Sequence, residues 1–152
     1  MLSVVRIRGT ADLSNEVRDT LKSLGLNAPN HCALVPEMPA YKGMLDKVKD
    51  VVTYGEIEKK MLVEMLKKRL RMTDDKKVNE STLKTVTKFN SYDEFADMLI
   101  QGKAMLSDFK KLQPIFRLTP PSKGFRSIRE HYPKGDLGYR GTAINSLLKR
   151  MI

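Results

Sequence analysis

Along the first 25 residues the hydrophobic positions change from an alternating to a helical spacing. Apolar residues alternate over 2–7, and this stretch is rich in Val and Ile, which predicts a β-strand. Over 13–24 they recur every three to four residues, which predicts an amphipathic helix. Ser14, or Asp12 just before it, is expected to cap the first turn, and Gly25 suits the left-handed position after the last turn.

A second strand, a second helix and a third strand follow. The apolar run at 30–35 predicts a strand, Pro39 opens a helix that reaches residue 48, and 50–54 predicts another strand. Gly43 lies inside this helix, where glycine is unfavourable, so we expect another part of the chain to approach it closely. This order predicts a β-α-β-α-β core over 1–55, with one three-stranded sheet and both helices on one face.

After the core the pattern becomes predominantly helical. Apolar residues at helical spacing predict helices over 57–70 and 79–86. Ser91 followed by Glu94 is the sequence of a capping box, in which the serine accepts from the third helical amide and the glutamate reaches back. This motif predicts a further helix over 92–101.

The last quarter of the chain combines a strand, an irregular segment and a helix. Residues 115–118 predict a fourth strand that anchors the irregular segment to the sheet, and 142–151 predict an amphipathic helix with its apolar side facing inward. The fold class is therefore expected to be α+β. We expect one structural unit with three parts, namely the core at 1–55, a helical extension packed on it at 56–113, and a strand, basic loop and terminal helix at 114–152.

The charge of the chain indicates a polyanionic partner. The 152 residues include 28 Lys and Arg against 18 Asp and Glu, a net charge of +10. Residues 114–152 hold eight basic and two acidic side chains, a net +6, so one quarter of the chain carries most of the excess. No apolar run approaches the roughly 20 residues that span a bilayer, so no membrane partner is expected. No signal peptide is recognisable, and we expect a cytoplasmic protein.

The segment between Arg117 and Arg140 differs in composition from the rest of the chain. It holds six Lys or Arg residues against two acids, with aromatic rings between them. Its glycines let the main chain approach a partner, and its prolines prevent a helix or strand from running through it. Arg and Lys bridge phosphates, and Arg and Tyr stack on exposed bases, so the segment is predicted to bind RNA. The alternative is a surface loop that is merely basic.

The expected RNA contacts form two groups. In the basic segment they are Arg117, Lys123, Gly124, Phe125, Arg126, Arg129, His131, Lys134, Gly135, Gly138, Tyr139 and Arg140. Basic residues of the first two helices offer a second contact edge, made of Arg18, Lys22, Lys42 and Lys47. Replacing Arg126 or Arg140 by alanine is expected to weaken RNA binding and to leave the thermal midpoint nearly unchanged.

Patterns typical of enzymes and metal sites are weak in this sequence. Cys32 lies in an apolar run and is expected to be a small buried residue, and the two histidines, His31 and His131, do not complete a metal-ligand spacing with it. The carboxylates at 93–97 fall in the first turns of a helix, where they complement the helix dipole. We therefore expect no catalytic residue, metal, cofactor or small-molecule substrate.

Several segments are distinctive, namely VVRIRG, TLKSLGL, HCALVPEMPAYKGMLDKV, VTYGEI, FRLTPPSKGF, HYPKGDLGYRG and INSLLKRMI. They resemble one known family, the universal large-subunit ribosomal proteins called L-thirty in bacteria and L-seven in eukaryotes. The first 55 residues resemble the minimal bacterial form, and the remainder resembles the longer archaeal and eukaryotic form. The basic N-terminal arm of the eukaryotic relatives is missing, which favours an archaeal source.

The resemblance implies a ferredoxin-like core and a structural role in the large ribosomal subunit, with large-subunit rRNA as the main partner. It leaves open contacts with the 5S rRNA and with neighbouring ribosomal proteins. Two other functions stay open on the residues alone. One is a free-standing RNA-binding or RNA-chaperone module, and the other is a small enzyme of the acylphosphatase type on the same core fold.

Overall fold

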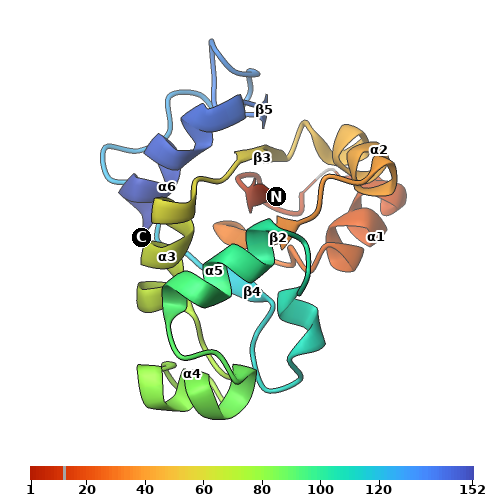
Figure 1. Cartoon of the computed structure of the whole chain (residues 1–152). Coiled ribbons are helices and arrows are strands. Elements are labelled where there is room, and N and C mark those ends of the chain that lie inside the picture. Colours follow the sequence, from red (N-terminus) through yellow and green to blue (C-terminus); the bar gives the residue numbers. More distant parts are fainter. Residues whose placement is uncertain (12) are drawn as a thin grey trace.

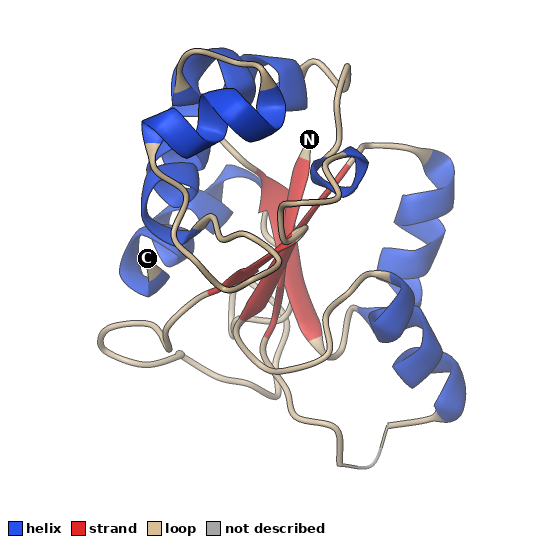
Figure 2. Ribbon diagram, turned by 90° about the horizontal axis from the view of Figure 1, so that it is seen from below, coloured by secondary structure: helices blue, strands red, loops and turns tan. Residues whose placement is uncertain are grey.

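A five-stranded sheet divides the molecule into two helical layers (Figures 1 and 2). The structure is a computed structural model that describes residues 1–11 and 13–152. Two helices cover one face of the sheet, and the remaining helices cover the other face (Figure 2). The strand order is β4-β2-β1-β3-β5, so the three strands of the first 55 residues form the centre of the sheet. The predicted α+β class is confirmed.

The central strand β1 (Leu2–Arg6) is antiparallel to both of its neighbours, β2 (His31–Val35) and β3 (Val52–Glu56). The third strand begins two residues later than predicted because the chain first turns, with the Val51 amide donating to the Val48 carbonyl at 2.9 Å. It then continues through Gly55, which lies directly against Gly141.

The first helical layer consists of α1 (Asn15–Ser23) and α2 (Pro39–Val48). Ser14 caps α1 as predicted, since its hydroxyl accepts from the Val17 amide at 3.4 Å. Asp12, the alternative cap, lies outside the described residues. The core between this layer and the sheet consists of Leu2, Val4, Leu21, Leu24, Leu26, Ala33, Val35, Leu45, Val48, Val51 and Val52.

The expectation for Gly43 is wrong. This residue lies within α2 and is exposed. Apart from its chain neighbours and the nearby backbone of its own helix, no described atom lies within 4 Å of the position that a Cβ would occupy. Its helix faces the sheet through Leu45 and Val48 instead. The glycine therefore makes no close contact in the described part of the chain.

The second helical layer contains α3 (Lys59–Arg69), α4 (Glu80–Thr87), α5 (Tyr92–Ile100) and α6 (Ile144–Met151). Val4 points into the first core while its neighbour Val5 points into the second, as the alternation of a strand requires. The second core also takes in Cys32 and the inward face of α6, whose apolar residues were predicted correctly. These are Ile144, Leu147, Leu148 and Met151.

The cap of α5 differs in detail from a capping box. The Ser91 hydroxyl accepts from the Asp93 amide at 3.1 Å, one residue earlier than predicted. The Glu94 carboxylate accepts from the Asn90 amide at 3.1 Å rather than from Ser91. The motif nevertheless marks the start of the helix correctly.

Two short strands complete the sheet at opposite edges. The predicted fourth strand is present as β4 (Ile115–Arg117), antiparallel to β2. The other is β5 (Gly138–Tyr139), which pairs in parallel with β3 and was not predicted. It begins after Pro133, the last proline of the basic segment, so no strand runs through the prolines. Its formation depends on contacts distant in sequence, such as the Thr53 hydroxyl donating to the Gly138 carbonyl at 3.2 Å.

Candidate nucleic-acid interface

The basic segment runs from one edge of the sheet to the other. It leaves β4 after Arg117, passes the end of α6 and returns as β5 at the opposite edge. Backbone bonds fix its path, because the Thr119 amide donates to the Met151 carbonyl and the Ser122 amide to the Arg150 carbonyl, both at 3.0 Å. The segment is therefore an ordered part of the surface that packs beside the last turn of α6.

A buried ion pair organises the second half of this segment. The carboxylate of Asp136 and the guanidinium of Arg140 lie 2.6 Å apart, and the two residues are 3% and 8% exposed. Asp136 also accepts a short hydrogen bond from the Arg126 amide, and the Arg140 guanidinium lies 5.1 Å from the centre of the Tyr132 ring. Asp136 therefore links the part of the loop around Arg126 to the part that ends at Arg140.

A groove of about 220 Å³ lies between the basic loop and α6. Ala143, just before the helix, and Ser146 and Arg150 within it form the helical wall. Three guanidinium groups line it, those of Arg126, Arg140 and Arg150, against the single carboxylate of Asp136. Arg126 and Arg150 are anchored by backbone carbonyls, at 3.0 Å to Pro133 and 3.2 Å to Gly124 respectively. The groove is therefore a positively charged hollow with arginines held in place.

Within the described part of the chain, the buried guanidinium of Arg140 is not fully hydrogen-bonded. Its Nε atom is buried and has no hydrogen-bond partner among the described residues. A buried donor without a partner is costly, and the ion pair with Asp136 at 2.6 Å is what holds this guanidinium in the loop.

The other cations of the loop lie on its exposed surface. Lys123, Arg129 and Lys134 are exposed, while the Phe125 ring packs against the second core and offers little surface for stacking on a base. Gly124 is exposed with a left-handed φ of +71° and open space around it. The three cations therefore add exposed positive charge to the loop, although none of them lines the groove.

Two of the predicted glycines serve the loop itself. A Cβ at Gly135 would collide with the Glu130 carbonyl, and one at Gly138 would lie 2.6 Å from the His131 ring. Both glycines are buried, so neither is placed to bring its main chain to a partner. His131 in turn lies against Asp50, with 2.7 Å between its Nε2 atom and the carboxylate.

Several predicted residues lie away from the groove. Arg117 lies on the opposite edge strand and forms an exposed ion pair with Asp75 at 3.1 Å. Arg18 and Lys22 line a separate hollow beside Arg6, near the far end of β1. The structure therefore does not gather all the predicted cations into one surface.

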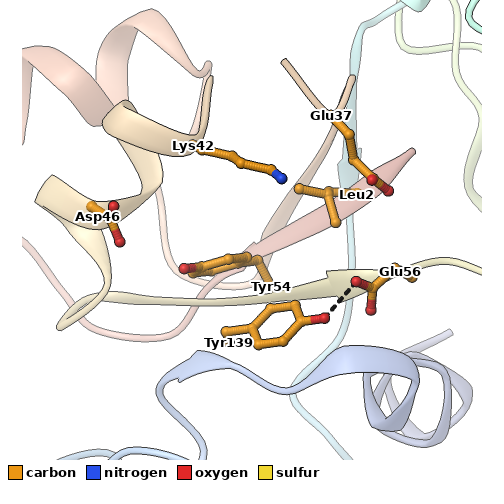
Figure 3. A pocket seen from close by; sticks show the side chains of 7 residues that line it. All are labelled: Leu2, Glu37, Lys42, Asp46, Tyr54, Glu56 and Tyr139. Carbon is orange, nitrogen blue, oxygen red and sulfur yellow. Dashed lines mark hydrogen bonds between the residues drawn. The ribbon is translucent and has the colours of Figure 1, made fainter. Parts of the chain in front are cut away.

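Two others meet in a different pocket. Lys42 and Tyr139 both line a cavity between α2 and the β3–β5 edge (Figure 3). Lys47 is exposed elsewhere on α2. Tyr139 points away from the groove because neighbouring residues of a strand face opposite sides, and Arg140 takes the groove side.

The sequence reasoning missed Arg150 and Ser146 as groove residues. Both line the groove from α6, one helical turn apart. Their i, i+4 spacing places them on one face of the helix, opposite the apolar residues, and this was the available signal.

The described residues include neither a membrane-spanning helix nor a cluster of metal-binding side chains. Within residues 1–11 and 13–152, no helix is long and apolar enough to cross a membrane. In the same residues, no three His, Cys, Asp or Glu side chains come together in a way that could hold a metal ion.

Known proteins resemble this chain over nearly its whole length. A relative from Archaeoglobus fulgidus, named large ribosomal subunit protein uL30, is 45% identical over 99% of both chains. Proteins with the same name from Methanoculleus marisnigri and Thermofilum pendens are 43% and 45% identical, over 99% and 98% of this chain and 99% and 97% of their own. A family model described as ribosomal protein L30p/L7e matches residues 2–52. With relatives this similar along almost the entire sequence, the chain belongs to the L30p/L7e family of ribosomal proteins.

Proposed function

We propose that this protein is a structural, non-catalytic constituent of the large ribosomal subunit that binds large-subunit rRNA through the arginine-lined groove. The relatives named large ribosomal subunit protein uL30 support the place of the chain in that particle. The groove between the basic loop and α6 is the single observation that carries the RNA contact.

The groove suits a phosphate backbone for three reasons. Its arginines are held by protein carbonyls, so little side-chain freedom is lost on binding. Guanidinium groups form two-pronged hydrogen bonds with phosphate oxygens. The exposed cations around it, Lys123, Arg129 and Lys134, extend the contact along a strand.

The proposal divides the predicted residues by role. Arg126, Arg150 and the three exposed cations contact RNA, while the Gly124 amide donates to the Pro121 carbonyl within the loop at 2.9 Å. Arg140, Asp136, Gly135 and Gly138 shape the loop that presents them. Arg18, Lys22 and Lys47 form a second contact edge on the first helical layer.

The test is the salt dependence of binding to large-subunit rRNA fragments. With about five cations neutralising phosphates, the logarithm of affinity should fall against the logarithm of salt concentration with a slope of roughly −4. Replacing Arg126, Arg129 and Lys134 together by alanine should reduce that slope by about 2 to 3. The matched control replaces Lys60, Lys67 and Lys68 of α3, which are exposed and do not line the groove.

Equal slopes for the loop triple variant and the α3 triple variant would contradict the proposal. A free-standing RNA-binding module would differ in another way. It would not sediment with large subunits at high salt, whereas a constituent of the subunit should.

A further inference from the structure

An acidic, aromatic pocket stands out on a protein whose net charge is +10. It lies between α2 and the β3–β5 edge and encloses about 230 Å³ (Figure 3). Its walls carry three carboxylates and one ammonium group, together with two tyrosine rings and a leucine. The lining residues are Leu2, Glu37, Lys42, Asp46, Tyr54, Glu56 and Tyr139.

The two rings form the floor of the pocket. Tyr54 and Tyr139 are paired across adjacent strands, with ring centres 5.6 Å apart and planes tilted by 48°. Tyr139 is held in place because its hydroxyl donates to the Glu56 carboxylate, a bond that raises the pKa of this tyrosine above its usual value. The residue is nevertheless 55% exposed, so the ring is accessible to a partner.

The carboxylates surround these rings from separate elements. Asp46 projects from α2 beside Tyr54, and its charge adds to the burial that raises the pKa of that tyrosine. Glu37 lies on the opposite side, after β2. Asp46 has no ion pair among the described residues, so its carboxylate is available to a ligand.

We infer that this pocket binds an arginine side chain from a neighbouring protein in the ribosomal particle. A guanidinium group is planar, lies flat on a tyrosine ring, and can donate to carboxylates at its edge at the same time. The pocket offers both kinds of partner within one small cavity. The Met1 amino group pairs with the Glu37 carboxylate at 3.2 Å, which leaves the carboxylates of Asp46 and Glu56 against the single ammonium of Lys42. Charge complementarity therefore favours a cation over RNA.

A metal ion does not account for the pocket. In the described part of the chain, no three acidic or histidine side chains converge as metal ligands do. The pocket and the arginine-lined groove share no lining residue, since Tyr139 lines the pocket and Arg140 lines the groove. The two can therefore serve different partners. This inference rests on the proposed function only in placing the chain within a particle.

Photo-crosslinking in purified large subunits tests the inference. Two exposed residues of similar character serve as matched positions, Met38 beside the pocket and Ile128 in the basic loop, which are 50% and 47% exposed. Each is replaced in turn by p-benzoylphenylalanine, and the adducts are identified by mass spectrometry after irradiation. We expect position 38 to join a protein peptide that contains arginine, and position 128 to join RNA.

Two variants link the adduct to the pocket. Asp46→Asn removes a charge without changing shape, and Tyr139→Leu removes the ring. Each should lower the yield of the position 38 adduct at least fivefold per incorporated protein, while leaving the position 128 adduct unchanged. An adduct between position 38 and RNA, a peptide without arginine, no adduct at all, or an unchanged yield in both variants would overturn the inference. Loss of the position 128 adduct alone would instead contradict the proposed RNA groove.

Discussion

Arg140 illustrates how the role of a charged residue depends on its partner. By composition it is one of six equivalent cations in the basic segment, and it was predicted to contact RNA. In the structure it is buried and paired with Asp136, four residues earlier, so its first role is to hold the loop together. The expectation that its removal would leave the thermal midpoint unchanged therefore needs correction.

Arg140→Ala should lower the free energy of unfolding by about 3 kcal/mol, because it leaves the buried Asp136 carboxylate without its ion-pair partner. Urea unfolding followed by circular dichroism measures this change. Arg129→Ala is the matched control, since it removes an exposed arginine from the same loop and should change stability by less than about 0.5 kcal/mol. Equal midpoints for the two variants would contradict the structural role of Arg140.

Cys32 was predicted to be a buried apolar residue, and it is fully buried in the second core. Burial raises the pKa of its thiol to about 12. The reactive thiolate is therefore scarce in the folded protein throughout pH 7 to 9, where an exposed cysteine becomes steadily more reactive. Iodoacetamide should label the folded protein slowly at every pH in that range and label the urea-unfolded protein quickly. A labelling rate in the native state as fast as that of the urea-unfolded protein would contradict this prediction.

At the scale of elements, periodicity in the sequence located almost every helix and the central strands. The apolar spacing of α6 and the Ser91 motif of α5 are local signals, and both elements are present. The strand β5 could not be predicted in this way, because two residues carry no periodicity. It forms only because β3, some 85 positions away in sequence, supplies hydrogen-bond partners such as Thr53.

Two glycines at element positions should respond in opposite directions to alanine. Gly43→Ala should stabilise the protein by about 0.5 to 1 kcal/mol, because the site is helical and has open space around it. Gly55→Ala should destabilise it, because the added methyl group would collide with the Gly141 carbonyl and force β3 away from the turn before α6. Thermal unfolding of both variants beside the parent measures the difference. A midpoint for Gly55→Ala at or above that of the parent would contradict the packing of these two glycines.

At the scale of the whole molecule, the two cores differ in how they are built. The first core uses only residues between Leu2 and Val52, almost the same stretch that the family model matches. The second core combines β1 and β2 with helices from the rest of the chain. The predicted division at residue 55 stays a prediction, and the composition of the first core supports it.

A fragment ending at residue 58 should fold without the remainder of the chain. It retains the entire first core and the whole of β3, whereas a fragment that ended at Tyr54 would lack Gly55 and Glu56, which pair with Ser3 and Leu2. Circular dichroism should show helix that is lost in a cooperative thermal transition. The same fragment with Leu45→Asp, which places a charge in the first core, should show no transition. A coil spectrum for the unmodified fragment would contradict its independence.

The candidate site was predicted in part. Composition identified the segment that contacts RNA in our proposal, because clustered cations and glycines are visible without coordinates. It could not separate Arg117, which lies on the opposite sheet edge with Asp75, from Arg126, which lines the groove. Nor could composition predict that Tyr139 faces the acidic pocket, because that orientation depends on the pairing of β5 with β3. The sequence alone shows which residues belong to the basic segment. The direction in which each of their side chains points is set by the folded sheet.

The most direct test of the RNA groove is a cryo-electron microscopy map of the large subunit that contains this protein. The quantity to measure is the distance from the guanidinium groups of Arg126 and Arg150 to the nearest rRNA phosphate oxygens. We predict about 3 Å for at least one of them, the length of a charge-assisted hydrogen bond. A groove that faces bulk solvent, or is filled by a protein neighbour, would contradict the account.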